Sequence, residues 1–173
     1  QNYTREEARL LDLCMVVHAD HGGGNNSAFT TRVLSSTGTD IYSAISGAIG
    51  SLKGPKHGGA NLAVKKQMEL VINEIGIQAS ELRIRQIVQD ILDGDFNDHT
   101  GLIYGIGHAV YTLSDPRSEI LAKQCEELSY EKFRHDEYEF YRKFSAIAID
   151  EIYKRKGIHV CTNVDFYSGL VYD

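Results

Sequence analysis

The chain is poor in the residues that interrupt or cross-link a fold. Only two of its 173 residues are proline, and three are cysteine, with no Cys-x-x-Cys pair among them. An odd number of scattered cysteines argues against a disulfide framework and against a structural zinc site. We therefore expect reduced thiols and a fold in which helices run with few interruptions.

The chain also lacks an excess of positive charge, a long apolar run and a recognisable leader. Its 18 Lys and Arg residues are outnumbered by 24 Asp and Glu, for a net charge of −6, which argues against a nucleic-acid surface. No apolar stretch reaches the length of a membrane span. The opening residues, QNYTREEARLL, contain no charged leader followed by an apolar stretch. We expect a cytoplasmic protein that binds neither nucleic acid nor membranes.

The spacing of the apolar residues predicts an all-α protein. Apolar side chains recur at helical spacing in six segments: residues 5–17, 41–52, 61–75, 81–92, 117–128 and 138–156. Asp40 and Ser80 are expected N-caps, and Gly94 and Gly157 are expected C-terminal stops. The segment 41–52 is rich in small residues, so we expect another helix to approach it closely and to bury it. We also expect Leu82 to face the interior.

Three of the seven histidines lie in glycine-rich frames: His21 in DHGGG, His57 in KHGGA and His108 in GIGHA. Glycine beside histidine removes side-chain bulk, so a ligand can approach the backbone. We expect His57 near the start of the following helix, where the helix dipole favours the neutral imidazole. A neutral histidine can donate a hydrogen bond to a carbonyl oxygen that gains negative charge. The alternative for His57 is an ordinary turn histidine.

Arg117 and Asp165 are further candidates for substrate chemistry. Arg117 follows His108 by nine residues. Arginine binds a carboxylate through two parallel hydrogen bonds, while histidine bonds a carbonyl or a second carboxylate. Asp165 lies between two apolar residues, so partial burial would raise its pKa and make it a better base. The alternatives are a surface ion pair for Arg117 and a helix N-cap for Asp165.

The HADH segment could also bind a metal ion through His18, Asp20 and His21. The two histidines are three residues apart, but no third converging ligand is evident and the HExxH spacing is absent. We therefore expect no metal site. A metal-dependent hydrolase stays open as a weak alternative.

Four segments in order closely resemble the citrate synthase family: HADHGGGNNSAFTTRV, SAISGAIGSLKGPKHGGAN, GIGHAVYTLSDPR and NVDFYSG. The resemblance covers nearly the whole chain. It implies a multihelical fold in which a large domain dimerises and a small domain closes over the substrates. Residues 1–52 would belong to the large domain, 53–161 would form the small domain, and 162–173 would begin the return to the large domain.

The resemblance also implies roles for the site residues. His21 would hold oxaloacetate, and His57 would hydrogen-bond the thioester oxygen of acetyl-CoA. His108 would polarise the oxaloacetate carbonyl, Arg117 would grip a substrate carboxylate, and Asp165 would remove a proton from the acetyl methyl group. The CoA adenine would lie against the loop before His108, at Leu102, Ile103, Gly105 and Gly107.

The implied activity is an acyl transfer in which acetyl-CoA and oxaloacetate give citrate and CoA. Acetyl-CoA would be a co-substrate, with no bound cofactor and no metal. Family members are longer on both sides, and their C-terminal arginines have no counterpart here. We therefore expect a fragment that is inactive or nearly so alone, from a protein that is a homodimer at full length. Two alternatives stay open: a 2-methylcitrate synthase using propionyl-CoA, and a non-catalytic ligand-binding module of the same fold.

Overall fold

The computed structural model describes residues 3–19, 24–54 and 57–172. Within these ranges the regular structure is α-helical, apart from one isolated bridge between Ile106 and Thr162. This confirms the expected all-α class. The chain forms two compact units, residues 1–60 and 61–173, and each is described by itself. The domain limits at 52/53 and 161/162 stay a prediction.

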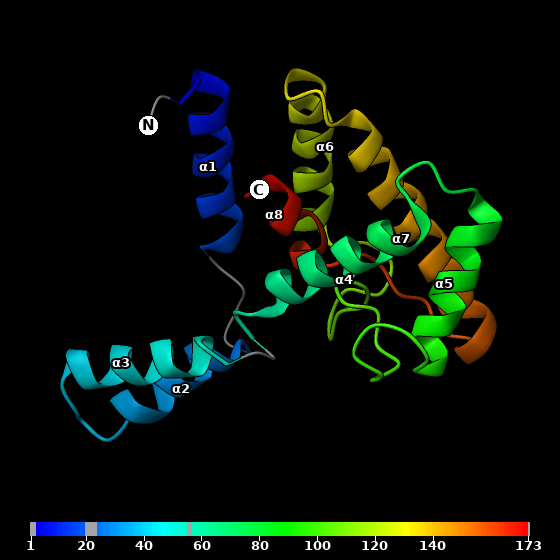
Figure 1. The fold of residues 1–173 in the computed structure, drawn as a ribbon. Coiled ribbons are helices and arrows are strands. Elements are labelled where there is room, and N and C mark those ends of the chain that lie inside the picture. Colours follow the sequence, from blue (N-terminus) through cyan, green and yellow to red (C-terminus); the bar gives the residue numbers. More distant parts are fainter. Residues whose placement is uncertain (1–2, 20–23, 55–56, 173) are drawn as a thin grey trace. The chain divides into compact units, whose positions relative to one another are not determined.

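Unit 1 contains α1 (Arg5–His18), α2 (Asn26–Ser35) and α3 (Ile41–Leu52). Each begins at a polar side chain that accepts hydrogen bonds from the first backbone N–H groups of the helix. Thr4, Asn25 and Asp40 are these caps, so the expected cap of α3 is confirmed. The helices α2 and α3 pack against each other as a pair (Figure 1).

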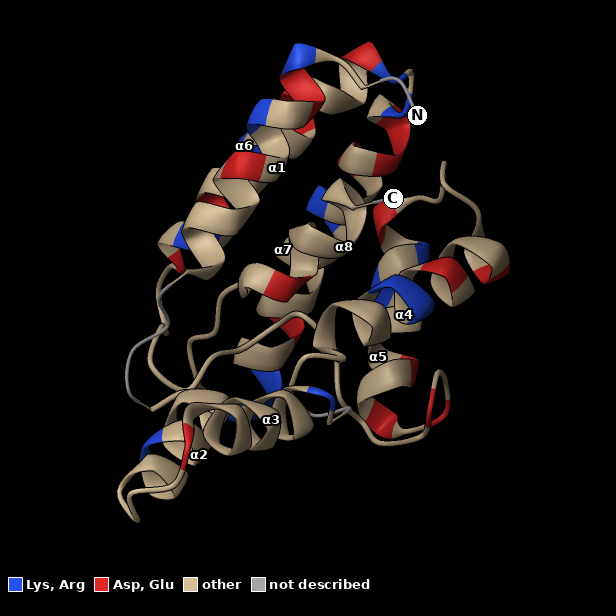
Figure 2. Cartoon of the chain, turned by 90° about the vertical axis from the view of Figure 1, so that its left-hand side faces the viewer, with Lys and Arg blue, Asp and Glu red and all other residues tan. Residues whose placement is uncertain are grey.

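The small residues of α3 allow the close approach that was expected. A β-carbon added to Gly47 would lie 2.3 Å from Leu34 Cδ1 of α2. The expected burial is wrong, because Ala44 is the one buried residue of α3, whereas Tyr42 is 81% exposed and Ile49 is 61% exposed. The helix carries no charged residue (Figure 2). It therefore shows an exposed apolar face.

The described part of unit 2, up to residue 172, contains five helices: α4 (Ala60–Ile75), α5 (Glu81–Asp93), α6 (Pro116–Glu131), α7 (His135–Lys156) and α8 (Val164–Val171). The first residue of α4 belongs to unit 1. The longest helix, α7, packs against α5 and α6, and α6 packs against α8. Apolar side chains fill the interior, among them Met68, Phe140, Phe144 and Phe166, each at most 2% exposed. This core holds the ends of α6 and α8, where the candidate site residues lie.

The predicted helix ends are confirmed where the local sequence carries a cap signal. Ser80 caps α5, and Gly94 and Gly157 end α5 and α7 with φ of +80° and +65°, values that suit glycine. The residue Leu82 is 80% exposed, so its expected inward orientation is wrong. It lies in the first turn of α5, whose buried stripe runs through residues 84, 87, 88 and 91.

Three helices differ from the prediction in existence or length. The helix α2 was not predicted, because NSAFTTRVLS is rich in Thr, Ser and Asn and none of its residues is buried. The helix α6 reaches Glu131 and α7 starts at His135, so both are longer than expected. No helix in the described part of the chain is both long and apolar enough to cross a membrane.

Candidate active site

The imidazole of His108 is oriented by its own loop, which connects α5 to α6. Its Nδ1 atom accepts hydrogen bonds from the backbone N–H groups of Val110, at 3.0 Å, and Tyr111, at 3.1 Å. A ring nitrogen that accepts carries no hydrogen, so neutral His108 holds its hydrogen on Nε2. His108 is therefore prepared as a hydrogen-bond donor through Nε2.

Arg117 is fixed by a buried carboxylate. Its Nε and Nη2 atoms donate to the two oxygens of Asp115 at 3.0 and 2.8 Å, and its backbone N–H donates to Asp115 Oδ1 at 3.0 Å. The side chains of Asp115 and Arg117 are 0% and 12% exposed. The alternative of a surface ion pair is thus wrong, because the pair is buried and its two side-chain bonds are parallel.

The pKa of Asp115 reflects this environment. Burial opposes ionisation and tends to raise the pKa of the carboxyl group. The hydrogen bonds and charge of Arg117 outweigh burial and hold that pKa below its ordinary value. Asp115 is therefore an anion that also caps the N-terminus of α6.

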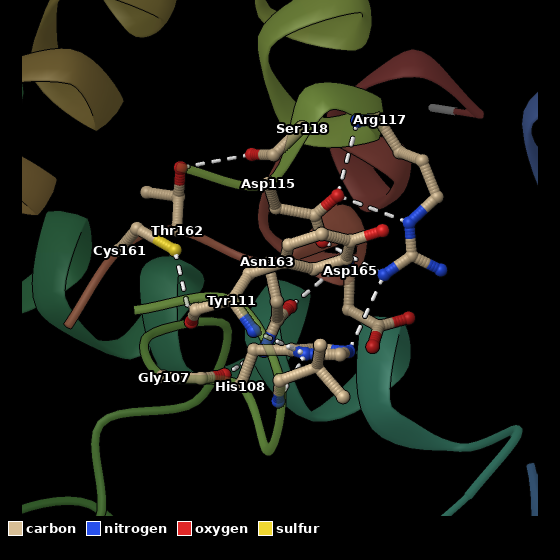
Figure 3. A network of polar contacts seen from close by, with 11 residues as sticks. Gly107, His108, Tyr111, Asp115, Arg117, Ser118, Cys161, Thr162, Asn163 and Asp165 are labelled. Atoms are coloured by element: carbon tan, nitrogen blue, oxygen red, sulfur yellow. Dashed lines mark hydrogen bonds and ion pairs between the residues drawn. The ribbon is translucent and has the colours of Figure 1, made fainter. Parts of the chain in front are cut away.

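Two hydrogen-bond donors lie close together at this point. Arg117 Nη2 and His108 Nε2 are 3.4 Å apart. Figure 3 marks this contact. Because Nδ1 already accepts from two backbone N–H groups, Nε2 carries the hydrogen in the neutral ring, and both groups can donate to one shared oxygen acceptor. A substrate with adjacent carbonyl and carboxylate oxygens matches this pair of donors.

Asp165 lies at the start of α8 and is half-buried. The N-cap of α8 is Asn163, whose Oδ1 accepts from the backbone N–H of Asp165 at 3.0 Å. The alternative that Asp165 is the cap is therefore wrong. Figure 3 shows its carboxylate on the same side as the Arg117 guanidinium group and the His108 ring.

The loop before His108 is packed tightly between α4 and α8. A β-carbon at Gly105 would lie 2.7 Å from Phe166 Cδ2 and 2.9 Å from Val64 Cγ2. The side chain of Gln67, fully buried in α4, accepts from the N–H of Tyr104 at 2.9 Å and donates to its carbonyl at 3.4 Å. These contacts fix the backbone that leads to His108.

The four residues expected to receive CoA adenine differ in exposure. Leu102 is 54% exposed, and Ile103 is 6% exposed. Gly105 is buried, whereas Gly107 is half-buried and has a φ of +98°. Their predicted role stays a prediction.

The other two predicted site residues belong to unit 1. His57 lies in the turn three residues before α4, in agreement with its expected place, and its Nε2 is 2.7 Å from Ser27 Oγ of α2. His21 lies outside the described residues, as does Asp20, so the metal hypothesis for the HADH segment is not addressed. His18 Nδ1 lies 2.7 Å from the carbonyl oxygen of Cys14.

Comparison with known proteins identifies the family. A family model described as citrate synthase, C-terminal domain, matches residues 1–173. The chain belongs to the citrate synthase family. The citrate synthase of Deinococcus radiodurans is 41% identical over 170 residues, and that of Synechocystis sp. is 41% identical over 165 residues. The matches cover 98% and 95% of this chain but 41% and 38% of those proteins.

Solved structures of citrate synthases share the fold. A ternary complex of citrate synthase from Thermoplasma acidophilum with carboxymethyl coenzyme A and oxaloacetate has a TM-score of 0.77 and 29% identity. That match covers 99% of this chain and 42% of the other chain. The present chain thus spans about two fifths of the citrate synthases that it matches, and the activity of the whole protein is a matter for proposal.

Four residues that bond a predicted site residue or the loop leading to one were missed by sequence reasoning: Ser27, Gln67, Asp115 and Asn163. Two had local signals. Asp115 stands directly before Pro116, a pattern typical of a helix N-cap followed by proline at the first helical position. Asn163 stands two residues before Asp165, where an N-cap would lie. Ser27 and Gln67 bond partners 30 and 37 residues away, so their roles needed the tertiary structure.

Proposed function

We propose that the protein containing this chain condenses acetyl-CoA with oxaloacetate to give citrate and free CoA. The carrying observation is the pair of donors at His108 Nε2 and Arg117 Nη2, 3.4 Å apart, each held by hydrogen bonds of its own. Such a pair suits the keto oxygen and neighbouring carboxylate of oxaloacetate. Membership in the citrate synthase family supports the same substrates.

The first chemical step would be enolisation of acetyl-CoA. Asp165 takes a proton from the acetyl methyl group, and His57 donates a hydrogen bond to the thioester oxygen as negative charge develops there. The hydroxyl of Ser27 can donate to His57 Nε2, which leaves the ring hydrogen on Nδ1 for that oxygen. A thioester methyl group is weakly acidic, so both groups are needed.

The second step would join the two substrates. The enol carbon attacks the keto carbon of oxaloacetate, and His108 donates to the keto oxygen as it becomes an alkoxide. Arg117 holds a carboxylate of the same substrate, and the proposed role of His21 is also to bind oxaloacetate. Water then cleaves the citryl thioester, which releases citrate and the thiol of CoA.

We further propose that the 173-residue chain alone is inactive or nearly so, because it spans about 41% of the length of the first relative. We also propose a cytoplasmic homodimer at full length. The exposed, uncharged face of α3 supports an apolar contact with a second copy. The loop residues Leu102, Ile103, Gly105 and Gly107 would contact CoA.

The test is release of free CoA thiol with oxaloacetate and acetyl-CoA, measured in the longer protein and in the 173-residue chain. We expect release that needs both substrates in the longer protein and little in the chain alone. His57→Ala should lower kcat by about 10²–10³-fold, the typical cost of losing one donor at a developing oxyanion. His159→Ala, which removes an exposed histidine stacked on Tyr153, is the matched control.

The outcomes separate the proposals. No thiol release from the longer protein would overturn the condensation. A preference for propionyl-CoA would replace acetyl-CoA as the substrate and keep the mechanism. Full activity of the 173-residue chain would overturn the claim that it is incomplete.

A further inference from the structure

Asn163 bonds both segments of unit 2 that carry proposed acid–base groups. Its Oδ1 accepts from the backbone N–H of Asp165 at 3.0 Å, and its Nδ2 donates to the carbonyl oxygen of Gly107 at 2.9 Å (Figure 3). Gly107 is the residue before His108. One side chain therefore connects the loop of His108 to the first turn of α8, which carries Asp165.

The two partners define the orientation of the Asn163 amide. The N–H of Asp165 needs an acceptor and the carbonyl of Gly107 needs a donor, so oxygen and nitrogen are assigned without ambiguity. Aspartate offers only acceptors at these two positions, and serine is too short to reach both. Among common cap residues, asparagine is the one that supplies a cap and a second donor together.

The loop of His108 depends on such a bond at Gly107, the residue next to the histidine. Gly105 and Gly107 have φ of +82° and +98°, a region that glycine enters readily. At Gly107 no described atom beyond its two chain neighbours lies within 4 Å of the place where a β-carbon would be, so side-chain packing does not hold it. Hydrogen bonds do so instead: its N–H donates to the Cys161 carbonyl at 2.8 Å, and its carbonyl accepts from Asn163.

We propose that Asn163 is a positioning residue that keeps His108 and Asp165 in a fixed mutual arrangement. Its cap orients the start of α8, and its amide donor fixes the loop from which His108 takes its orientation. The alternative is a plain helix cap that stabilises α8 and nothing more. The consequence for catalysis rests on the proposed function, but the positioning itself does not.

The first test uses the 173-residue chain and its His108 ring. Asn163→Ser keeps an oxygen that can cap α8 and removes the donation to Gly107. Long-range ¹H–¹⁵N spectra should show one tautomer of His108, protonated on Nε2, in the parent chain. In the variant we expect a mixture of His108 tautomers. We also expect the Tyr111 amide hydrogen to exchange about tenfold faster, since tenfold corresponds to the free energy of about one hydrogen bond.

Ser80→Ala is the control for lost stability, because it removes the cap of α5, in which the Ser80 side chain accepts from the backbone N–H of Arg83 in the same helix. It should lower stability and leave the His108 spectrum unchanged. A His108 spectrum in Asn163→Ser identical to that of the parent would overturn the positioning role and leave only the cap.

The second test is kinetic and uses the longer protein. Asn163→Ser should raise the KM for oxaloacetate about tenfold with kcat changed by less than about threefold, because the donor pair loosens while the cap remains. Asn163→Ala should lower kcat as well, because the turn that carries Asp165 is then uncapped. Absence of thiol release from the parent would refute the proposed function, whereas an active parent with unchanged KM in Asn163→Ser would refute the positioning role.

Discussion

The buried pair of Asp115 and Arg117 gives the sharpest prediction on stability. Replacing Asp115 by asparagine removes the charge but keeps one oxygen that can still accept from the backbone N–H of Arg117. Breaking a buried ion pair by changing one partner costs about 3–5 kcal/mol. Because the helix cap survives, we expect the lower end, about 3 kcal/mol, for Asp115→Asn and a larger loss for Asp115→Ala.

Urea unfolding followed by circular dichroism measures this loss. With a slope of about 2 kcal/mol per molar urea, the midpoint of unit 2 should fall by about 1.5 M at pH 7. The matched control is Asp93→Asn. Asp93 also receives two bonds from an arginine, Arg155, but these side chains are 53% and 32% exposed. We expect little change in the urea midpoint of Asp93→Asn, since exposed ion pairs contribute little to stability.

The acid dependence supplies a second criterion for the same variant. The folded-state pKa of Asp115 is lowered, while an unfolded aspartate titrates at about 3.9. The contribution of ionised Asp115 to the free energy of unfolding is therefore fully present above about pH 4, and it is lost as pH falls through the lowered pKa of the folded state. The gap between parent and Asp115→Asn should stay constant from about pH 7 to 5 and shrink at lower pH. Equal stability at pH 7 would refute the reasoning.

Two further predictions concern packing and ionisation in unit 2. Gly105 has a φ of +82°, and an added β-carbon would lie 2.7 Å from Phe166, so Gly105→Ala should lower the free energy of unfolding in urea by about 2–4 kcal/mol. Gly107 has open space around it, so Gly107→Ala should lower that free energy by only about 1 kcal/mol. Equal losses in the two variants would contradict the packing argument. Burial raises the pKa of Tyr138 to about 12, so its stabilising contribution is complete below about pH 10 and is lost as pH rises through 12. The pKa values of Tyr104 and Tyr167 are also raised, so ultraviolet titration should show late tyrosine ionisation whose amplitude Tyr138→Phe lowers by one tyrosine. An unchanged amplitude in the variant would contradict the assignment.

Features encoded in adjacent residues could be predicted from the sequence. The caps at Asp40 and Ser80 and the stops at Gly94 and Gly157 depend on a few neighbouring residues, and all four are confirmed. The helix α2 was missed because its sequence carries no apolar stripe. Its start depends on Asn25, whose side chain accepts from the backbone N–H groups of Ser27 and Ala28.

Features that depend on distant residues could not be predicted. The small residues in α3 correctly predicted a close helix neighbour. They do not predict how many faces of the helix other elements cover, and most of α3 is exposed. The bond from Asn163 to Gly107 joins positions 56 residues apart, and the bond from Ser27 to His57 spans 30. By contrast, His108 and Arg117 are only nine residues apart. One loop, which ends at the N-cap of α6, brings their side chains together.

The most direct test of the account asks whether the donor pair of His108 and Arg117 binds oxaloacetate. The ¹⁵N-labelled chain would be titrated with oxaloacetate up to about 10 mM, so that binding as weak as a millimolar Kd, about −4 kcal/mol, is still detected. Acetate at matched ionic strength is the control. We predict saturable shifts of His108 Nε2 and Arg117 Nε with oxaloacetate, no comparable shifts with acetate, and their loss in Asp115→Asn. No response at either nitrogen, or equal shifts of both with acetate, would contradict oxaloacetate binding by this donor pair.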